Sequence, residues 1–370
     1  MSIAKRFLMW VLTFIVGILL PLLLIEGVFN LLPVVSNMNT ERVNEEDPIR
    51  HFKINEVYNY SRGWNFSIIT KKKSNNYGFL SDIDYKEGGE HPLLVVIGDS
   101  YVEAMQVENN KTMHGILAKR VEDRGYIYGI GYSGAPMSQY LSYAKYARDE
   151  FQPDAVSITI VGNDFDESLM SVRPNPGFHY FVDDQDGQLT LKRLDFEDAG
   201  LRGWMKKSAV MRYLFLTAGL DWRSIVSHVM PDDVHDKRLF IGNTSADTSE
   251  KRLLESKRVV DAFLEKLPIM SGLQESNILL VVDGMRQSLY SKEAAKKASG
   301  SYFDIMRKYF MARAKARGFE VIDMHPVFNM HYRINKQKFE YPIDAHWNEL
   351  GHKLVADEIE KSDLFREIMQ

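Results

Sequence analysis

The chain has 370 residues, 45% of them hydrophobic, which is enough to bury a substantial core and excludes general disorder. The formal net charge is −4, and the basic run Lys71–Lys73 is too short to indicate nucleic-acid binding. There is no cysteine, which excludes disulfides, thiolate catalysis and cysteine-ligated zinc.

The first predicted element is an apolar helix near the N-terminus. Residues 7–25 are apolar apart from Thr13, Gly17 and Pro21. At helical rise they extend roughly 28 Å, close to the thickness of the hydrocarbon layer. Lys5 and Arg6 precede this run and acidic residues follow it, so the positive-inside rule places the N-terminus in the cytoplasm.

A cleaved signal peptide is the alternative. Its apolar region is shorter, about 7–15 residues, and it ends in a small-residue cleavage site that this sequence lacks. We therefore expect residues 1–33 to be an uncleaved, single-pass anchor in the inner membrane. The remainder would then be extracytoplasmic (periplasmic).

Residues 34–90 are interpreted as a juxtamembrane spacer leading into a main domain at 91–370. In that domain, apolar runs alternate with helical segments. This pattern predicts an α/β fold: a three-layer, doubly wound (flavodoxin-like), mainly parallel five-stranded sheet. The strands are expected at 93–97, 126–130, 155–161, 278–282 and 319–322, and the helices at 103–121, 137–150, 250–267, 292–317 and 349–361.

Residues 165–249 interrupt this alternation. The segment is rich in Asp, Gly, Pro and aromatic residues and leaves the carboxyl end of a predicted strand. Such a long insertion predicts a lid or binding subdomain. The alternative is a surface elaboration whose aromatic residues form a small core of their own.

Ser100 directly follows a predicted strand. The run Leu93–Ile97 has no polar alternation, as in a strand covered on both faces, and Gly98-Asp99 is a turn pair. A serine at a strand-to-helix turn exposes its hydroxyl and has its amide near a helix start. Both features suit a nucleophile that also stabilises an oxyanion. The alternative is a serine that only caps the next helix.

Further polar groups are expected at the same edge of the sheet. His346 can act as a base for Ser100, and Asp344 can fix the tautomer of its ring. Gly134 and Asn163 can donate hydrogen bonds to an oxyanion, together with the Ser100 amide. Taken singly, each has an ordinary alternative, since glycine and asparagine are common in turns and a loop histidine needs no function.

Two further observations limit the alternatives. His352 is a competing base, which ranks lower because it faces along a predicted helix and has no paired carboxylate. No His-x-x-x-His pair or carboxylate cluster has the spacing of metal ligands, so no metal is expected.

Four blocks of the sequence belong together: Gly98-Asp99-Ser100, Gly134, Gly162-Asn163-Asp164, and Asp344 with His346. As a set they resemble the SGNH (GDSL-like) hydrolases and acyltransferases, in a membrane-anchored bacterial form. They occur in that family's order, over about residues 93–361. Two positions depart from its pattern: Tyr101 replaces the usual leucine, and the last block is Asp-x-His instead of Asp-x-x-His. The shorter form is similar to the Asp-x-His-Trp loop of alginate acetyltransferase-like members and leaves open a more distant carboxylate as the orienting group.

The resemblance implies catalysis by Ser100, Asp344 and His346, oxyanion donors at Ser100, Gly134 and Asn163, and no cofactor. With the anchor, it predicts an extracytoplasmic serine esterase or O-acyltransferase that acts on O-acetyl groups of a glycan through an acyl-enzyme. The expected partners are an acylated carbohydrate or other ester and the membrane, with a membrane partner supplying the acyl donor in the case of transfer. The alternatives are a lipid-directed esterase or thioesterase and a catalytically silent, anchored glycan-binding protein.

Overall fold

The computed structural model describes residues 3–38, 40–88, 90–197, 207–220 and 239–369. The chain forms two compact units. The smaller comprises Met1–Met38, Val57–Lys71 and Asp198–Val234. The larger comprises Asn39–Glu56, Lys72–Glu197 and His235–Gln370.

The larger unit is built on a five-stranded parallel sheet. Its strands lie in the order β11-β10-β5-β3-β4, which is the flavodoxin-like order of a doubly wound sheet. Every residue of β3, β5 and β10 is buried, as expected for central strands covered on both faces. The predicted fold class is therefore confirmed. The strands are β3 (Leu93–Gly98), β4 (Tyr126–Gly131), β5 (Ala155–Ile160), β10 (Ile278–Val282) and β11 (Glu320–Asp323).

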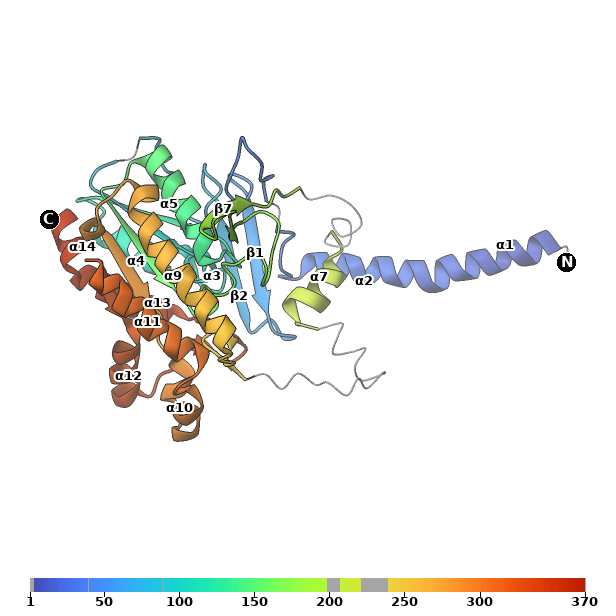
Figure 1. Cartoon of the computed structure of the whole chain (residues 1–370). Coiled ribbons are helices and arrows are strands. Elements are labelled where there is room, and N and C mark those ends of the chain that lie inside the picture. The colour runs from blue at the N-terminus through green and yellow to red at the C-terminus, as the bar shows by residue number, and fades with distance from the viewer. Residues whose placement is uncertain (1–2, 39, 89, 198–206, 221–238, 370) are drawn as a thin grey trace. The chain divides into compact units, whose positions relative to one another are not determined.

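Helices cover both faces of this sheet (Figure 1). On one face, α9 (Glu250–Ser271) packs against both α5 (Met137–Phe151) and α11 (Tyr302–Ala316). On the other face, α4 (Met113–Arg120) packs against α13 (Glu349–Lys361). The buried side chains of α4 and α13 form one cluster with those of β3 and β10. This cluster also includes two helices that were not predicted, α12 (Met324–Asn335) and α14 (Asp363–Ile368).

Two predicted helices are interrupted. In place of one helix over 103–121, a single turn, α3 (Ser100–Glu103), ends at Ala104 in the left-handed conformation. A loop with the short 3-10 turn η2 (Asn109–Lys111) then leads to α4. The predicted helix over 292–317 is divided because Ser301 caps the start of α11, after α10 (Lys292–Ala298) has ended.

The segment predicted as an insertion, 165–249, contributes two antiparallel hairpins to the larger unit. These are β6 (His179–Asp183) with β7 (Leu189–Arg193), and β8 (Phe240–Ile241) with β9 (Thr244–Ser245). Residues 198–206 and 221–238 of the predicted insertion lie outside the described residues. Near the C-terminus, β12 (Glu340–Tyr341) pairs with β13 (Asp344–Trp347). Short 3-10 turns, η4 (Glu275–Asn277) and η5 (Arg286–Leu289), flank β10.

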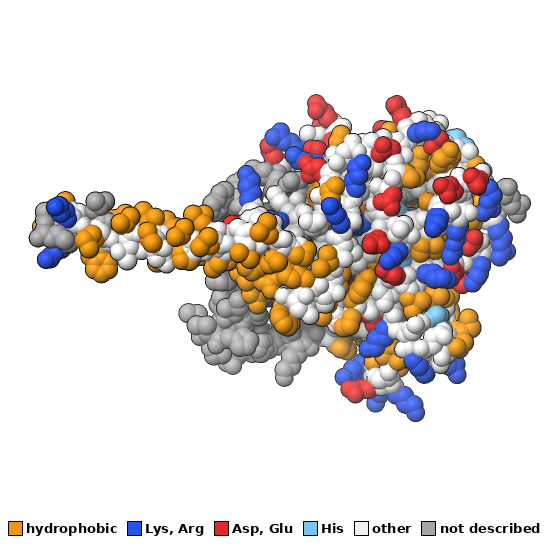
Figure 2. Space-filling model, turned by 180° about the vertical axis from the view of Figure 1, so that it is seen from behind, with side chains coloured by type: hydrophobic (Ala, Val, Ile, Leu, Met, Phe, Trp, Pro, Cys, Tyr) orange, Lys and Arg blue, Asp and Glu red, His pale blue; other side chains and the backbone are white. Residues whose placement is uncertain are grey.

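The smaller unit contains the apolar helix predicted at the N-terminus. Ile3–Leu31 is helical throughout, as α1 (Ile3–Phe14), the π-helical η1 (Ile15–Leu19) and α2 (Leu20–Leu31). With a mean hydropathy of 2.8 and no buried residues in its most apolar window, it is long and apolar enough to cross a membrane. Figure 2 shows hydrophobic side chains along this helix and basic side chains at its amino end. The unit also contains β1 (Val57–Arg62), the start of β2 (Ile68–Lys73), α7 (Ala209–Arg212) and the π-helical η3 (Tyr213–Thr217).

Candidate active site

Ser100 begins helix α3 at the carboxyl end of β3. Asp99 is the N-cap of this helix, and its carboxylate accepts a hydrogen bond from the Tyr101 N–H at 3.0 Å. Burial raises the pKa of Asp99 to about 6, although the hydrogen bond from the Tyr101 N–H opposes the rise. The turn therefore holds the Ser100 hydroxyl at the sheet edge, because the Asp99 cap fixes the backbone on both sides of Ser100.

Ser100, His346 and Asp344 lie in a hydrogen-bonded row. The Ser100 Oγ is 2.8 Å from His346 Nε2, and the Asp344 Oδ1 is 2.5 Å from His346 Nδ1. Asp344 also accepts the backbone N–H of His346 at 3.0 Å. A neutral His346 with its proton on Nδ1 therefore presents Nε2 to the serine hydroxyl, which is the arrangement required of a general base.

The short spacing from Asp344 to His346 is explained by the local secondary structure. Both residues lie on strand β13, where side chains two positions apart point to the same face. The carboxylate thus reaches the ring without an intervening loop. Its other oxygen, Oδ2, accepts a hydrogen bond from Gln106 at 3.4 Å. The sequence alone left a more distant carboxylate open, and the structure places Asp344 itself against the ring.

Gly134 and Asn163 line the same cavity as Ser100. Gly134 lies in a turn closed by the Ala135 N–H and the Tyr132 carbonyl, and its φ of +81° favours glycine. Asn163 donates one N–H to Glu167 Oε2 at 3.2 Å, which leaves the second N–H of its amide for an oxyanion.

Gly162, which precedes Asn163, is required for a steric reason. A Cβ at this position would lie 1.9 Å from the Gly242 carbonyl oxygen in the β8–β9 hairpin. Asn243, the next residue of that hairpin, lines the cavity and donates a hydrogen bond to the Tyr101 hydroxyl at 2.8 Å. The Gly162-Asn163 turn therefore forms one wall of the cavity by close backbone contact with the hairpin.

The Asn163→Ala substitution is expected to lower kcat by roughly 10²- to 10³-fold, as the loss of one oxyanion donor does. The measurement is kcat on a small acetyl ester. Asn335→Ala, on the exposed end of α12, is a matched control expected to leave kcat unchanged. An unaltered kcat in the Asn163 variant would mean that Asn163 shapes the turn and does not donate to the oxyanion.

The cavity has a volume of about 220 Å³ and ten lining residues, nearly all of them polar. Five of these were not predicted as site residues, and all five come from the segment 165–249. The only signal in the sequence was the position of this segment, directly after a strand whose end carries Asn163. The five are Glu167, Arg173, Asn175, Tyr180 and Asn243.

A buried ion pair supports the strand that carries His346. Arg286 donates hydrogen bonds to the Ala345 carbonyl at 2.8 Å and to Asp283 Oδ2 at 3.1 Å. Asp283 Oδ1 in turn accepts the Trp347 indole N–H at 3.0 Å. Both neighbours of His346 in the chain are thus held by one Arg–Asp pair. Asp283 directly follows the predicted strand 278–282, whereas no feature of the sequence marked Arg286 as a site residue.

A second pair of buried charges lies beside Gly134. The Lys72 ammonium donates hydrogen bonds to the backbone carbonyls of Glu103 and Ala104, at 2.9 and 2.7 Å. The Glu103 carboxylate accepts a hydrogen bond from the Ser133 hydroxyl. Burial raises the pKa of Glu103 to about 7, although Ser133 and the charge of Lys72 oppose the rise.

This raised pKa predicts a pH-dependent effect of Glu103→Gln on stability. When the pKa of a carboxyl is higher in the folded state than in the unfolded state, the protein loses stability as the pH rises from the unfolded to the folded pKa. For Glu103 this range is about 4.5 to about 7. We therefore compare the free energy of unfolding of the glutamine variant with that of the wild type. This difference is expected to shift in favour of the variant by roughly 1–3 kcal/mol between pH 4.5 and pH 8. Denaturant unfolding of both proteins at the two pH values measures this difference, and an equal difference at both values would contradict it.

His352 does not line the cavity. Its ring is buried against Trp347, and its Nδ1 accepts the Met113 N–H at 3.3 Å. Burial lowers its pKa well below the ordinary value for histidine. Asn348, which follows β13, caps α13 by accepting the Gly351 N–H at 3.0 Å.

Among the described residues, no group of three or more His, Asp or Glu side chains is arranged to hold a metal ion.

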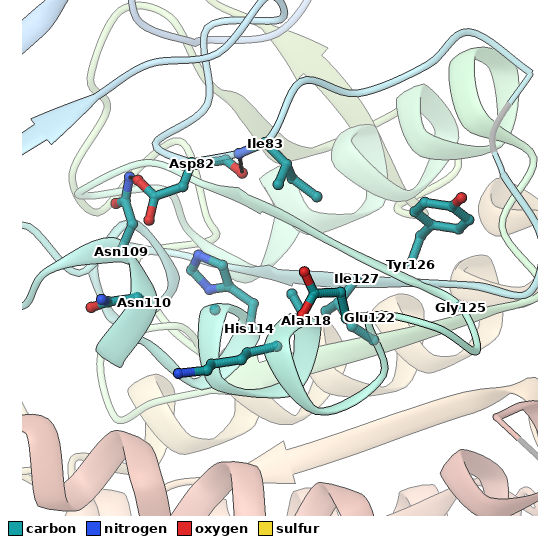
Figure 3. A pocket seen from close by; sticks show the side chains of 13 residues that line it. Asp82, Ile83, Asn109, Asn110, His114, Ala118, Glu122, Gly125, Tyr126 and Ile127 are labelled. Atoms are coloured by element: carbon teal, nitrogen blue, oxygen red, sulfur yellow. Dashed lines mark hydrogen bonds between the residues drawn. The ribbon is translucent and has the colours of Figure 1, made fainter.

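A separate cavity of about 390 Å³ lies between α4 and the start of β4 (Figure 3). His114 and Asn109 line it, and Asn109 donates a hydrogen bond to Asp82 at 2.8 Å. Burial lowers the pKa of His114 to about 3, so its imidazole stays neutral. Because none of the triad residues lines this cavity, the chemistry described above belongs to the smaller cavity at Ser100.

Comparison with known proteins found no matching family model and no matching curated protein. Several solved structures are similar over about three quarters of the chain. One is a member of the lipolytic G-D-S-L family from Veillonella parvula DSM 2008, with 10% identity over 73% of this chain and 97% of that chain, and a TM-score of 0.39. Another is an acetyl xylan esterase, with 14% identity over 73% and 98% of the chains and a TM-score of 0.38. A third is a lipase/acylhydrolase from Enterococcus faecalis, with 13% identity over 73% and 95% and a TM-score of 0.36.

At identities and TM-scores this low, the likeness carries no conclusion about this chain. The strand order and the position of the four blocks at the carboxyl edge of the sheet are properties of the chain itself. They match the arrangement that the sequence resemblance to the SGNH (GDSL-like) hydrolases predicts.

Proposed function

We propose that this protein is a membrane-anchored, extracytoplasmic serine esterase or O-acyltransferase that acts on O-acetyl groups of a glycan. The observation that carries the proposal is the row of Ser100, His346 and Asp344, with separations of 2.8 and 2.5 Å. A serine hydroxyl paired with an oriented imidazole, next to amide donors, is equipped for acyl transfer.

In the first half of the reaction, Ser100 Oγ attacks the acetyl carbonyl while His346 Nε2 takes the hydroxyl proton. The negative charge on the tetrahedral intermediate is stabilised by the N–H groups of Ser100, Gly134 and Asn163. His346 then gives its proton to the leaving sugar oxygen, and acetyl-Ser100 remains. In the second half, His346 deprotonates either water, which releases acetate, or a sugar hydroxyl, which receives the acetyl group.

The character of the cavity supports a short acyl group on a hydroxyl-rich substrate. Its volume of about 220 Å³ and its polar side chains, including Asn175 and Asn243, suit an acetyl group on a sugar. Its described lining has no apolar wall for a long acyl chain, so this observation disfavours the lipid-directed alternative. Tyr180 is the aromatic residue of the lining, and its hydroxyl accepts the Asn175 N–H at 2.9 Å.

The anchor proposal rests on the helix Ile3–Leu31, whose length and composition suit a membrane span. Lys5 and Arg6 at its start support a cytoplasmic N-terminus and a periplasmic catalytic domain in a protein of the inner membrane. In the case of transfer rather than hydrolysis, a membrane partner would supply the acyl donor.

The test compares acyl length and acceptor with the full chain in detergent micelles. We expect acetate release from acetylated xylan and from p-nitrophenyl acetate, little turnover of p-nitrophenyl palmitate, and no turnover by Ser100→Ala. Acetylated products formed in the presence of a non-acetylated oligosaccharide would identify transfer. A preference for the palmitate ester would favour the lipid-directed alternative. Lack of turnover of every ester by the folded protein would favour the silent binding protein.

A further inference from the structure

The N-terminal helix is joined to a segment far along the chain by one carboxylate. Glu26, on α2, accepts hydrogen bonds from the Ser208 hydroxyl at 2.7 Å and from the N–H groups of Ala209 and Val210 at 2.5 and 3.2 Å. It thereby caps the first turn of α7, where the backbone N–H groups have no partner within the helix. Glu26 and residues 208–210 belong to the smaller unit.

Aromatic contacts continue this docking along η3. The Tyr213 ring lies 4.7 Å from the ring of Phe29 and 5.4 Å from that of Phe66, measured between ring centroids. Its hydroxyl donates a hydrogen bond to the Trp64 carbonyl at 2.6 Å. The segment 208–217 is therefore fixed at the level of Glu26 and Phe29 on the helix.

Two backbone-directed contacts complete the attachment. Arg212 donates a hydrogen bond to the Val35 carbonyl at 2.6 Å, and the Thr217 carbonyl accepts the Gly63 N–H at 2.7 Å. The Thr217 hydroxyl is also 3.0 Å from that of Ser61. The segment is thus tied to Val35, just after the helix, and to Ser61 and Gly63, as well as to the helix itself.

The length of the helix sets the depth of this segment in a bilayer. A hydrocarbon layer of about 30 Å takes about 20 helical residues. Counted from the basic pair Lys5-Arg6, this length ends near Glu26, and a charged side chain at that boundary avoids the cost of burial in lipid. Because α7 is hydrogen-bonded to Glu26, it lies at the same depth, among the headgroups of the outer leaflet.

The side chains around this segment suit such a position. Trp64 is 76% exposed, and Leu216 and Leu220 are each 43% exposed. Tryptophan and tyrosine are favoured at the membrane–water interface, and short apolar segments bind there through the apolar area that they bury.

We propose that residues 208–220 and Trp64 form a second membrane contact, lying in the headgroup region of the outer phospholipid leaflet beside the transmembrane helix. This inference rests on the proposed anchor, which supplies the depth. The contact would hold the smaller unit against the bilayer by an interfacial surface as well as by the span.

The experiment uses the absence of cysteine in the native chain. Single cysteines are placed in the full-length protein, labelled with an environment-sensitive fluorophore, and reconstituted in phosphatidylcholine–phosphatidylglycerol vesicles. Quenching is measured with lipids that carry a spin label either near the headgroup or deep in the acyl chain. The sites are Leu216→Cys as the test, Leu23→Cys within the proposed span, and Leu254→Cys, which is 62% exposed on α9, as the matched control.

We expect the shallow spin label to quench the Leu216 site at least about threefold more strongly than the Leu254 site, and the deep label to quench the Leu23 site. Equal shallow quenching at Leu216 and Leu254, with Leu23 quenched by the deep label, would overturn the interfacial contact and leave the anchor standing. If the deep label fails to quench Leu23, the anchor and the contact both fall. The esterase part of the proposed function is tested separately by turnover.

Discussion

Replacing His346 by alanine is expected to lower kcat by roughly 10⁴- to 10⁶-fold while the protein stays folded. Among the described side chains that line the cavity, His346 is the one imidazole, and its Nε2 lies 2.8 Å from Ser100 Oγ. Without it, the hydroxyl proton has no base to receive it when Ser100 attacks. The measurement is kcat on an acetyl ester, with circular dichroism to check the fold.

The matched control is His331→Ala, because His331 lies on α12 and its ring contacts Gln337 and Asn335 outside the cavity. Its kcat is expected to equal that of the wild type. A folded His346→Ala protein with full activity would contradict the assignment and return His352 to consideration as the base.

The second large effect is expected on stability. Arg286→Met should lower the free energy of unfolding by roughly 3–5 kcal/mol, the usual cost of breaking a buried ion pair by removing one partner. The Arg286 side chain is 6% exposed, and its loss leaves Asp283 buried without its cation. The Ala345 carbonyl also loses the shorter of its two hydrogen bonds and keeps the one from the Tyr101 hydroxyl at 3.2 Å, so the strand that carries His346 is held less firmly and kcat is expected to fall with stability. Denaturant unfolding of the full chain in detergent micelles measures the change.

Two variants distinguish this effect from a general cost of losing arginine. Arg313→Met removes the arginine of a more exposed pair with Asp261, and its expected cost is below about 1 kcal/mol. The double variant Arg286→Met/Asp283→Asn removes both buried charges and keeps an acceptor for Trp347, so it should regain part of the lost stability. An Arg286→Met protein as stable as Arg313→Met would contradict the role of this pair.

The sheet was predictable because its central strands are short, mainly apolar runs, each followed closely by glycine or aspartate. Leu93–Ile97 and Ile278–Val282 are covered on both faces, so tertiary packing requires the same residues that the sequence pattern shows. The interrupted helices were not predictable from periodicity. Ala104 takes up a left-handed conformation that alanine does not favour, so the surrounding fold imposes the end of α3.

The site was predictable where residues are near in sequence or lie at strand ends. Asp344 and His346 share one strand face, and Ser100 and Asn163 follow parallel strands at one edge. The walls of the cavity were not, because Arg173 and Asn243 come from a long irregular segment whose path depends on tertiary contacts. Arg286 was missed for a related reason, since an arginine in a loop is usually exposed and nothing local indicates the buried Asp283.

Covalent labelling of the full chain by a fluorophosphonate decides whether Ser100 is an activated nucleophile. The geometry predicts one labelled serine in the wild type, assigned to Ser100 by peptide mass, and no labelling of Ser100→Ala. Labelling of a different serine, or none in a folded wild-type protein, would contradict the proposal that this row of side chains performs acyl transfer.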